Sequence, residues 1–399
     1  MNDWIKVQGF PLVNVSFNDG KLSLRQENFE KFSPCNWKIP LKITVDNSNS
    51  ILHLLESRED DLELGVSSDS SFIIVNHGQA SFCRVQYDEE MTRTLTENID
   101  KMDVKDKVGL LSDAQACFSS GRLDLDQLLN IFKKYSGQTD YAVVQQLLSV
   151  TMFLEVIYEQ TYQWSNFLKL CYEVLSPSLQ SLGFAPVEGE SSDDSLSRSD
   201  LVTVLGRLGH NDTVGRCWSM WHHHQDQGKT MTSQDLKKAV FSTVARTCRW
   251  ETTEMMMKMY ETSSSAETQK MLRCLALNNH PDTKSRVLDW VMSDRVKLQD
   301  KTFFLAGVAS TDLTGRSLVW RHFVDNSDHW LSLYKTGRLL INLIRAVTGQ
   351  GSANTREELE MFEKWFSENK IEGVERNIDQ ILEEIRSVAE LRRSLFNRD

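Results

Sequence analysis

The sequence predicts a mixed, mainly α protein in which a small antiparallel β-sandwich precedes a large α-α superhelical domain of the HEAT- or armadillo-like kind. Residues 10–88 contain short runs of alternating or β-branched residues, which are typical of strands. From residue 90 to residue 399 the apolar residues follow a helical period without a strand signal. The 399 residues also exceed what one ordinary core can enclose, so we expect at least two domains.

Turn-forming residues separate the predicted strands of the first domain. We expect strands at residues 11–17, 21–26, 41–46, 51–55 and 72–76. The segment Asn18-Asp19-Gly20 joins the first two and is a hairpin signal, because these residue types tolerate the positive φ angles of a tight turn. About five to seven short strands within about 80 residues are typical of a small sandwich.

The second domain contains roughly fifteen predicted helices joined by short polar turns, which favours a stacked array of helix pairs over a closed bundle. Thr355 and Glu358 form a T-x-x-E capping box, and Thr232 is expected to open another helix. Residues 187–199 are acidic and serine-rich, so we expect a long mobile loop there. The last helix carries an apolar stripe of Val374, Ile378, Ile381, Ile385, Val388 and Leu391.

Charge and apolar runs argue against two classes of partner. The net charge of −11, without a long Lys/Arg cluster, would repel a phosphate backbone, so no nucleic-acid partner is expected. No apolar run approaches the roughly 18 residues that span a bilayer, so no membrane partner is expected either. The N-terminus also lacks the basic and apolar segments of a signal peptide.

Cysteine usage predicts a cytoplasmic protein. The seven cysteines are odd in number and widely spaced, and no C-x-x-C pair occurs among them. Neither a disulfide framework nor a zinc ribbon fits this spacing, so we expect buried free thiols in a reducing compartment. The cysteines are Cys35, Cys83, Cys117, Cys171, Cys217, Cys248 and Cys274.

The sequence contains no recognisable catalytic or metal motif. None of its nine histidines precedes a glutamate, so the helical zinc motif H-E-x-x-H is absent. Successive helical residues point about 100° apart, so His222–His224 cannot converge on one metal ion and are expected at a solvated helix end. The methionines of Met255–Met259 are expected in the core. We therefore expect no catalytic residue, metal site or cofactor within this chain.

Strings in the first domain resemble the gluzincin zinc aminopeptidases. Trp4-x-x-x-Gln8-Gly9-Phe10-Pro11 resembles the segment that leads out of that family's catalytic domain into its sandwich. Trp37-x-Ile39-Pro40-Leu41 resembles the next sandwich signature. Phe82-Cys83-Arg84-Val85-x-Tyr87 is similar to the strand that closes the sandwich, with Cys83 in place of the usual aromatic residue.

The helical domain is most similar to the puromycin-sensitive type of these enzymes. Val204-Leu205-Gly206-Arg207-Leu208-Gly209-His210 follows that subfamily's pattern. Gln299-Asp300, Gly307-Val308-Ala309 and Gly315-Arg316 follow it in the same order. Because the order holds across nearly the whole sequence, the chain resembles the C-terminal half of such an enzyme, a β-sandwich plus an α-superhelical domain.

The resemblance implies domain limits and an inactive chain. Residues 1–9 would be a remnant of the catalytic-domain end, 10–88 the sandwich, and 90–399 the superhelical substrate-chamber domain. In the complete family enzyme, G-x-M-E-N holds the substrate's amino terminus, and H-E-x-x-H with a downstream glutamate binds the zinc that activates water. Neither motif occurs here, since no methionine or histidine precedes a glutamate. Zinc is therefore expected only in the complete enzyme, and this chain should be inactive alone.

The resemblance also implies a chamber that caps the active site and holds the distal part of the peptide. Tyr334, Arg338, Asn342 and Arg345 are the candidate chamber residues, within a segment that resembles a family segment entering an inner helix. Arg338 takes the place of the family's phenylalanine and Asn342 that of its arginine. Arginine side chains suit a peptide carboxylate. A basic helix start on the surface is the alternative interpretation of these residues.

Two interpretations of the whole chain stay open, with a weaker third. The first is the non-catalytic C-terminal portion of a zinc aminopeptidase, whose partners would be peptides and the missing catalytic domain or a homologous chain. The second is a stand-alone truncated paralogue that acts as a peptide- or protein-binding scaffold without catalysis. The third is a hydrolase with an unrecognised site. Genomic sequence upstream of Met1 would separate the first two.

Overall fold

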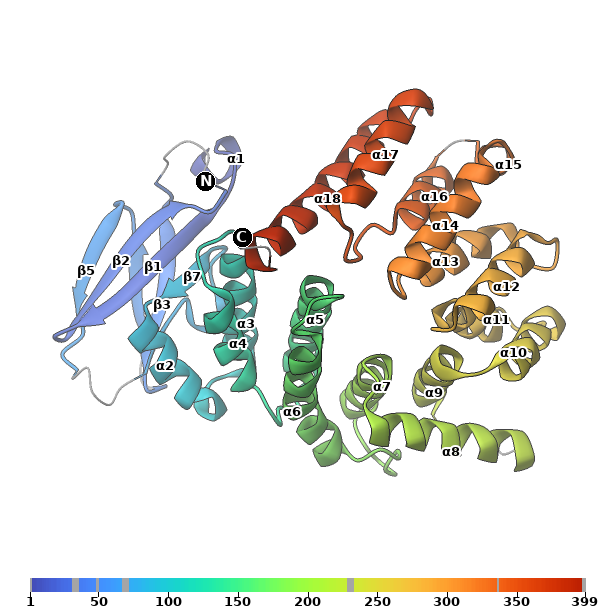
Figure 1. Cartoon of the computed structure of the whole chain (residues 1–399). Helices are drawn as coiled ribbons and strands as arrows, with labels where there is room; N and C mark the ends of the chain where they lie inside the picture. The colour runs from blue at the N-terminus through green and yellow to red at the C-terminus, as the bar shows by residue number, and fades with distance from the viewer. Residues whose placement is uncertain are drawn as a thin grey trace. The chain divides into compact units, whose positions relative to one another are not determined.

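The computed structural model describes residues 2–30, 36–47, 50–66, 72–227, 233–335 and 337–396. Strands occupy the N-terminal part and helices the rest (Figure 1), so the predicted mainly α fold with an N-terminal sandwich is confirmed. The chain divides into two compact units, Met1–Val150 with Glu173–Leu182 and Thr151–Tyr172 with Gly183–Asp399. We call them the sandwich unit and the helical unit.

Within the described residues, seven strands form two sheets of the sandwich unit. They are β1 (Pro11–Asn18), β2 (Lys21–Asn28), β3 (Ile39–Val45), β4 (Ile51–Leu55), β5 (Glu59–Glu63), β6 (Ile73–Val75) and β7 (Arg84–Tyr87). One sheet has the order β5-β2-β1-β7 and the other β4-β3-β6. The strand pairs are antiparallel, except that β1 and β7 run parallel. The predicted hairpin joins β1 and β2, and its Asp19 and Gly20 have positive φ angles of 51° and 79°.

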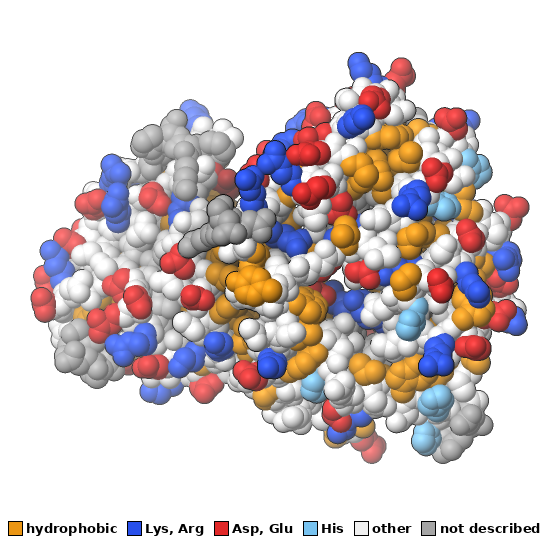
Figure 2. Space-filling view, in the orientation of Figure 1, with side chains coloured by type: hydrophobic (Ala, Val, Ile, Leu, Met, Phe, Trp, Pro, Cys, Tyr) orange, Lys and Arg blue, Asp and Glu red, His pale blue; other side chains and the backbone are white. Residues whose placement is uncertain are grey.

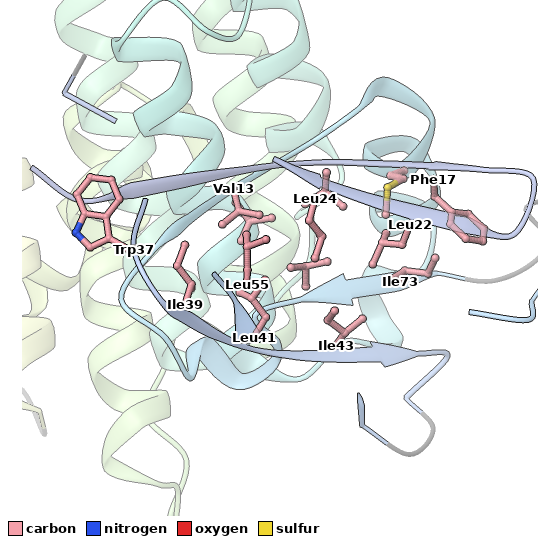
Figure 3. Packing of buried hydrophobic residues seen from close by; sticks show 14 residues of the cluster. Val13, Phe17, Leu22, Leu24, Trp37, Ile39, Leu41, Ile43, Leu55 and Ile73 are labelled. Carbon is pink, nitrogen blue, oxygen red and sulfur yellow. The ribbon is translucent and has the colours of Figure 1, made fainter. Parts of the chain in front are cut away.

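The two sheets enclose one apolar core (Figure 3). Val13 and Leu24 point from one sheet toward Leu41 and Ile43 of the other, and all four side chains are buried. Burial of each such side chain contributes roughly 1.5–3 kcal/mol. Trp37 closes one end of this core, and its backbone N–H donates a hydrogen bond to Gln26 Oε1 at 2.8 Å.

Helix α3 (Val104–Ser119) packs on the sandwich because buried carboxylates fix it there. Asp113 is 6% exposed and accepts hydrogen bonds from the backbone N–H of Val85 and from Nη1 of Arg84, both at 2.9 Å. Asp106 accepts another from the backbone N–H of Gly78 at 2.7 Å. The sandwich unit extends beyond the change from strands to helices, into α5 (Tyr141–Tyr158) as far as Val150, and it also includes Glu173–Leu182.

The remaining helices complete the two units. The short elements and helices of the sandwich unit are α1 (Asn2–Lys6), η1 (His77–Gln79), α2 (Glu89–Glu97), η2 (Ile99–Lys101) and α4 (Leu125–Lys133). Helix α6 (Trp164–Leu182), like α5, has residues in both units. The helical unit continues with α7 (Ser192–Arg207), α8 (Asn211–Gln227), α9 (Gln234–Thr247), α10 (Trp250–Thr262), α11 (Ala266–Met271), η3 (Leu272–Leu277), α12 (Pro281–Met292), α13 (Leu298–Ala309), α14 (Leu313–Asp325), α15 (Ser327–Leu333), α16 (Arg338–Thr348), α17 (Arg356–Glu368) and α18 (Glu375–Phe396).

Close backbone approaches hold one row of the helical unit together. The elements α7, α9, η3, α13 and α16 each contact the next, while α8, α10 and α12 lie on the outer side of this row (Figure 1). A Cβ atom on Gly206 would lie only 2.1 Å from Thr243 Oγ1, and one on Gly307 only 2.4 Å from Ala276 Cβ. Neither contact leaves room for a side chain, so glycine sets the spacing of α7 from α9 and of α13 from η3.

The expectation of a long loop at residues 187–199 is wrong, because helix α7 begins at Ser192, within this range. Ser191 caps this helix by accepting a hydrogen bond from the backbone N–H of Asp194, and the acidic first turn favours the positive end of the helix dipole. Arg198 is 2% exposed, and it donates to Glu190 and to the backbone oxygen of Gly183. Buried pairing thus orders a segment whose composition resembles a loop.

Three further expectations each concern a single helix. The capping box of Thr355 and Glu358 is confirmed at the start of α17. Thr232 lies outside the described residues, and Ser233 caps α9. By length and composition α5 could cross a membrane, with a mean hydropathy of 1.4, so the expectation that no apolar run approaches that length is wrong. Half of that stretch is buried in the protein, as in a core helix.

The cysteines agree with the expected free thiols. Six are free in the described part of the chain, and all except the partly exposed Cys83 are buried. Burial raises the pKa of Cys83 and Cys117 to about 12, so neither thiol is ionised near neutral pH. Cys35 lies outside the described residues.

Candidate functional site

The four residues predicted from the sequence divide into one buried residue and one helix face. Arg338, Asn342 and Arg345 follow one another at positions i, i+4 and i+7 of α16, so they share a face of that helix. Both arginines are exposed and Asn342 is partly buried, while the opposite face packs Leu340, Leu343 and Ile344 into the core. We call the first three residues the α16 face.

Tyr334 lies in the core, away from solvent. Its side chain is 2% exposed, its ring stacks on Trp330 at a centroid distance of 6.1 Å, and its hydroxyl donates to the backbone oxygen of Leu298 at 2.6 Å. Burial raises the pKa of Tyr334 to about 12. Its hydroxyl anchors α13 to the segment that precedes α16, and it has no exposed surface to offer a ligand.

A second group of charged residues gathers at the ends of helices in the helical unit. We call it the charge cluster, and its members are Glu155, Glu159, Arg207, Arg246, Lys284, Asp312, Arg316, Glu358 and Arg392. Five are basic and four are acidic. Figure 2 shows basic and acidic side chains side by side in the hollow of the helical unit.

Most cations of the charge cluster are paired with its carboxylates. Arg207 forms an ion pair with Glu155. Lys284 Nζ donates to both oxygens of Asp312, at 2.7 and 2.6 Å. Burial lowers the pKa of Lys284, whose side chain is fully covered. Burial opposes ionisation of Asp312 too, but the hydrogen bonds from Lys284 and Gly315 together keep its pKa below the usual value.

Arg316 is the most extensively bonded member of the cluster. The residue is 1% exposed, and Nε donates to Glu358 Oε1 at 3.0 Å while Nη1 donates to Glu159 Oε1 at 3.2 Å. Its Nη2 donates to the backbone oxygen of Ala353, also at 3.0 Å. Burial raises the pKa of Glu159, although the charge of Arg316 acts against that shift. Acceptors from two distant segments, residue 159 and residues 353–358, thus converge on one guanidinium.

Arg246 differs from the other cations of the cluster. It is partly buried at the end of α9, and the structure describes no hydrogen bond or ion pair for its guanidinium among the residues it covers. Burial lowers its pKa, and Glu155, Arg207, Asp312 and Glu159 are the charges that act on it. A partly buried guanidinium with free donors can bind an anionic or carbonyl group of a ligand.

The sequence does not predict the charge cluster, because its members are scattered from residue 155 to residue 392. Arg207 and Arg316 do occur in the strings that carry the family resemblance, next to glycines that set helix spacing. A charged residue directly beside such a glycine is the signal that could have drawn attention to them. The other members stand in ordinary amphipathic helices and carry no such signal.

Within the described residues, one group of side chains has the composition and spacing of a metal site. It consists of His77, Asp103 and Asp106 in the sandwich unit. His77 Nδ1 and Asp106 Oδ2 are hydrogen-bonded at 2.8 Å, and Asp106 also accepts from the backbone of Gly78. These bonds attach η1 to α3, so the group has a structural role that needs no ion.

Comparison with known proteins identifies relatives along the whole chain. Residues 72–387 match the family described as ERAP1-like C-terminal domain. Aminopeptidase M1-B of Oryza sativa subsp. japonica is 26% identical over 97% of this chain and 46% of its own length. The puromycin-sensitive aminopeptidase of Caenorhabditis elegans is 24% identical over 98% of this chain and 44% of its own.

A third relative is named for the endoplasmic reticulum. Endoplasmic reticulum aminopeptidase 2 of Bos taurus is 25% identical over 96% of this chain and 42% of its own length. The chain thus spans about half the length of the curated relatives it matches. The aminopeptidase names belong to proteins more than twice as long as the aligned part.

Proposed function

Because this chain belongs to the ERAP1-like C-terminal domain family, we propose that it is the non-catalytic C-terminal portion of a zinc aminopeptidase. In this proposal the helical unit caps the active site and holds the distal part of the peptide. The observation that carries the proposal is Arg246, a cation of the charge cluster without a described partner, in a chain that lacks both catalytic motifs.

Arg246 would bind the carboxylate of a peptide, since a partly buried guanidinium offers several donors in a fixed plane. The α16 face would add Arg338, Asn342 and Arg345, which suit peptide carbonyl oxygens and acidic side chains. Arginine and asparagine bind such groups without cleaving them. Zinc in the complete enzyme would supply the hydrolytic chemistry, and no residue of this chain takes part in that step.

The catalytic half of the enzyme is the proposed macromolecular partner. Phe82 and Ile5 are 74% and 79% exposed, and Phe82 packs against Trp4 and Phe10 at ring distances of 6.4 and 5.7 Å. Exposed aromatic groups of this kind are typical of protein interfaces. We place the contact with the catalytic half there, either in the same polypeptide or in a homologous chain. Buried free thiols support a cytoplasmic location.

Calorimetric titration with a peptide of about ten residues tests the peptide-holding role. The expected result is weak binding that falls about tenfold, or about 1.4 kcal/mol, in Arg246→Gln and with a C-terminally amidated peptide. Arg338→Ala should weaken binding as well. Arg216→Gln is the matched control, because this exposed arginine pairs with Asp212 on α8. Absence of binding to any peptide would refute the role, and unchanged affinity in Arg246→Gln would remove that residue from the site.

A further inference from the structure

The two halves of helix α18 are held in different ways. Its first half is anchored by apolar side chains, and these are Ile378, Ile381, Leu382 and Ile385. None of the residues 386–396 is buried. Segments with few buried apolar contacts lie at the low end of local stability and open before the core does. The second half of α18 therefore depends on a small number of specific contacts.

Toward α5 and the segment before α17, those contacts include the polar bonds of Arg392 and one aromatic pair, while Arg386 forms an exposed ion pair with Glu363 of α17. Arg392 donates to the backbone oxygens of Ala353 and Glu159, which precede α17 and follow α5. Phe396 packs on Tyr158 at a ring distance of 5.4 Å. Burial lowers the pKa of Arg392, because the guanidinium gives up hydration in this position. Release of the helix would restore that hydration.

Arg316 holds the same two acceptor residues from inside the unit. It bonds the backbone oxygen of Ala353 and the carboxylate of Glu159, so both stay in place whether or not Arg392 is bound. Glu358 completes the support, since it accepts from Arg316 and also from the backbone N–H of Thr355 at 2.8 Å. Glu159 and Ala353 therefore keep bonds to Arg316 that do not depend on Arg392.

An open pocket at the protein surface lies beside the second half of α18. Its volume is about 470 Å³, and its walls include Ala389, Arg392, Arg393 and Phe396 of α18 together with Tyr162 and Asn354. Asn354 is 1% exposed, and the structure describes no hydrogen-bond partner for its Oδ1. The pocket opens to solvent, so protein does not pack against this side of α18, and an unpaired oxygen on a buried side chain is uncommon in a folded protein.

We propose that residues 386–396 of α18 form a strap that closes the helical unit on Glu159 and Ala353 and opens when Arg392 is released. Opening separates the end of α18 from α5 while residues 375–385 stay packed on α17. The strap gates entry of peptides to the hollow of the helical unit. This gating role rests on the proposed peptide-holding function, whereas the opening of the strap does not.

Hydrogen exchange of the full chain without peptide tests the opening. In the wild type, amides of residues 386–396 should exchange together and faster than those of 375–385. Arg392→Gln should speed exchange of 386–396 at least tenfold and leave α7 and α9 unchanged. Arg386→Gln is the matched control at the start of the strap, because Arg386 forms an exposed ion pair with Glu363 that contributes little, so it should speed exchange of 386–396 far less than Arg392→Gln does. If Arg392→Gln fails to fold, the difference in exchange between residues 386–396 and 375–385 of the wild type tests the opening by itself.

Two exchange results would overturn the strap. One is equal exchange along the whole of α18 in the wild type. The other is faster exchange throughout the helical unit of Arg392→Gln, which would make Arg392 an ordinary core residue.

Stopped-flow association of a fluorescent peptide tests the gate, with a faster rate expected in Arg392→Gln. An unchanged rate overturns the gating role. Absence of binding in both proteins refutes the peptide-holding function, and the exchange data distinguish that failure from failure of the strap.

Discussion

Arg316 and Glu159 are 157 positions apart in the sequence, yet Nη1 of the arginine donates to Oε1 of the glutamate at 3.2 Å. This bond joins the end of α5 to the start of α14, and Glu358 brings in the start of α17. Burying these charges is costly unless they stay paired. The helical unit is therefore closed by a buried ionic contact between segments that no local sequence pattern connects.

Removal of the Arg316 side chain should strongly destabilise the helical unit. Arg316→Leu leaves Glu159 and Glu358 as partly or fully buried carboxylates without their cation, so we expect a loss of about 3–5 kcal/mol. Urea unfolding followed by far-UV circular dichroism measures it. Arg356→Gln is the control, because Arg356 forms an exposed pair with Glu360 that should contribute about 0–1 kcal/mol. Equal losses in the two variants would contradict the buried-contact interpretation.

Two glycine substitutions should change stability in opposite directions. In Gly206→Ala the new Cβ would meet Thr243 Oγ1 at 2.1 Å, so overpacking between α7 and α9 should cost about 1–3 kcal/mol. In Gly215→Ala on α8 nothing lies within 4 Å of the new Cβ, so the better helix propensity of alanine should contribute about 0.5–1 kcal/mol. Thermal unfolding of both variants tests the pair. A stabilised Gly206→Ala protein would show that α7 and α9 are less close than described.

Asp113 should make the sandwich unit more stable at mildly acidic pH. Burial raises the pKa of Asp113 to about 6, against opposing hydrogen bonds from Val85 and Arg84. Between the usual aspartate pKa of about 4 and pH 6, the folded protein holds a proton that the unfolded chain has released. Stability therefore falls as pH rises through this window, by on the order of 1–3 kcal/mol, and stays level above it.

Unfolding curves from pH 4 to pH 8 test this dependence. In Asp113→Asn the fall in the free energy of unfolding between pH 4 and pH 6 that we assign to Asp113 should disappear. Asparagine does not titrate, but it can still accept the hydrogen bond from Val85. A stability that rises from pH 4 to pH 6 in the wild type and not in Asp113→Asn would show that the ionised form is the favoured one. That result would show that Arg84 affects the pKa of Asp113 more strongly than burial does.

Local chemistry accounts for the parts of the fold that the sequence predicts. The turn at Asp19 and Gly20 and the capping box of Thr355 each rest on adjacent residues, and both occur as expected. The sequence does not predict strand β5, because its segment EDDLE is too acidic to resemble a strand. It lies at a sheet edge, where charged residues prevent pairing with another chain. Composition does not predict the start of α7, because it carries no sign that Arg198 pairs with Glu190.

The candidate site was predictable only in part, for the same reason. Arg338 and Arg345 stand on one helix, so the sequence alone places them on a common face. Tyr334 precedes that helix, and its burial depends on Trp330 and on Leu298, 36 positions away. The charge cluster forms only when helices from α5 to α18 pack together. The sequence of α9 alone therefore does not show that Arg246 is without a described partner.

We propose that this chain contributes to peptide recognition without catalysing hydrolysis. Release of the naphthylamine from aminoacyl-naphthylamide substrates, measured with the purified chain with and without added zinc, tests it most directly. We predict no release above the uncatalysed rate in either condition, because no residue of the chain forms the zinc motif. Release that depends on zinc and disappears with a chelator would contradict the claim and locate a catalytic site within these 399 residues.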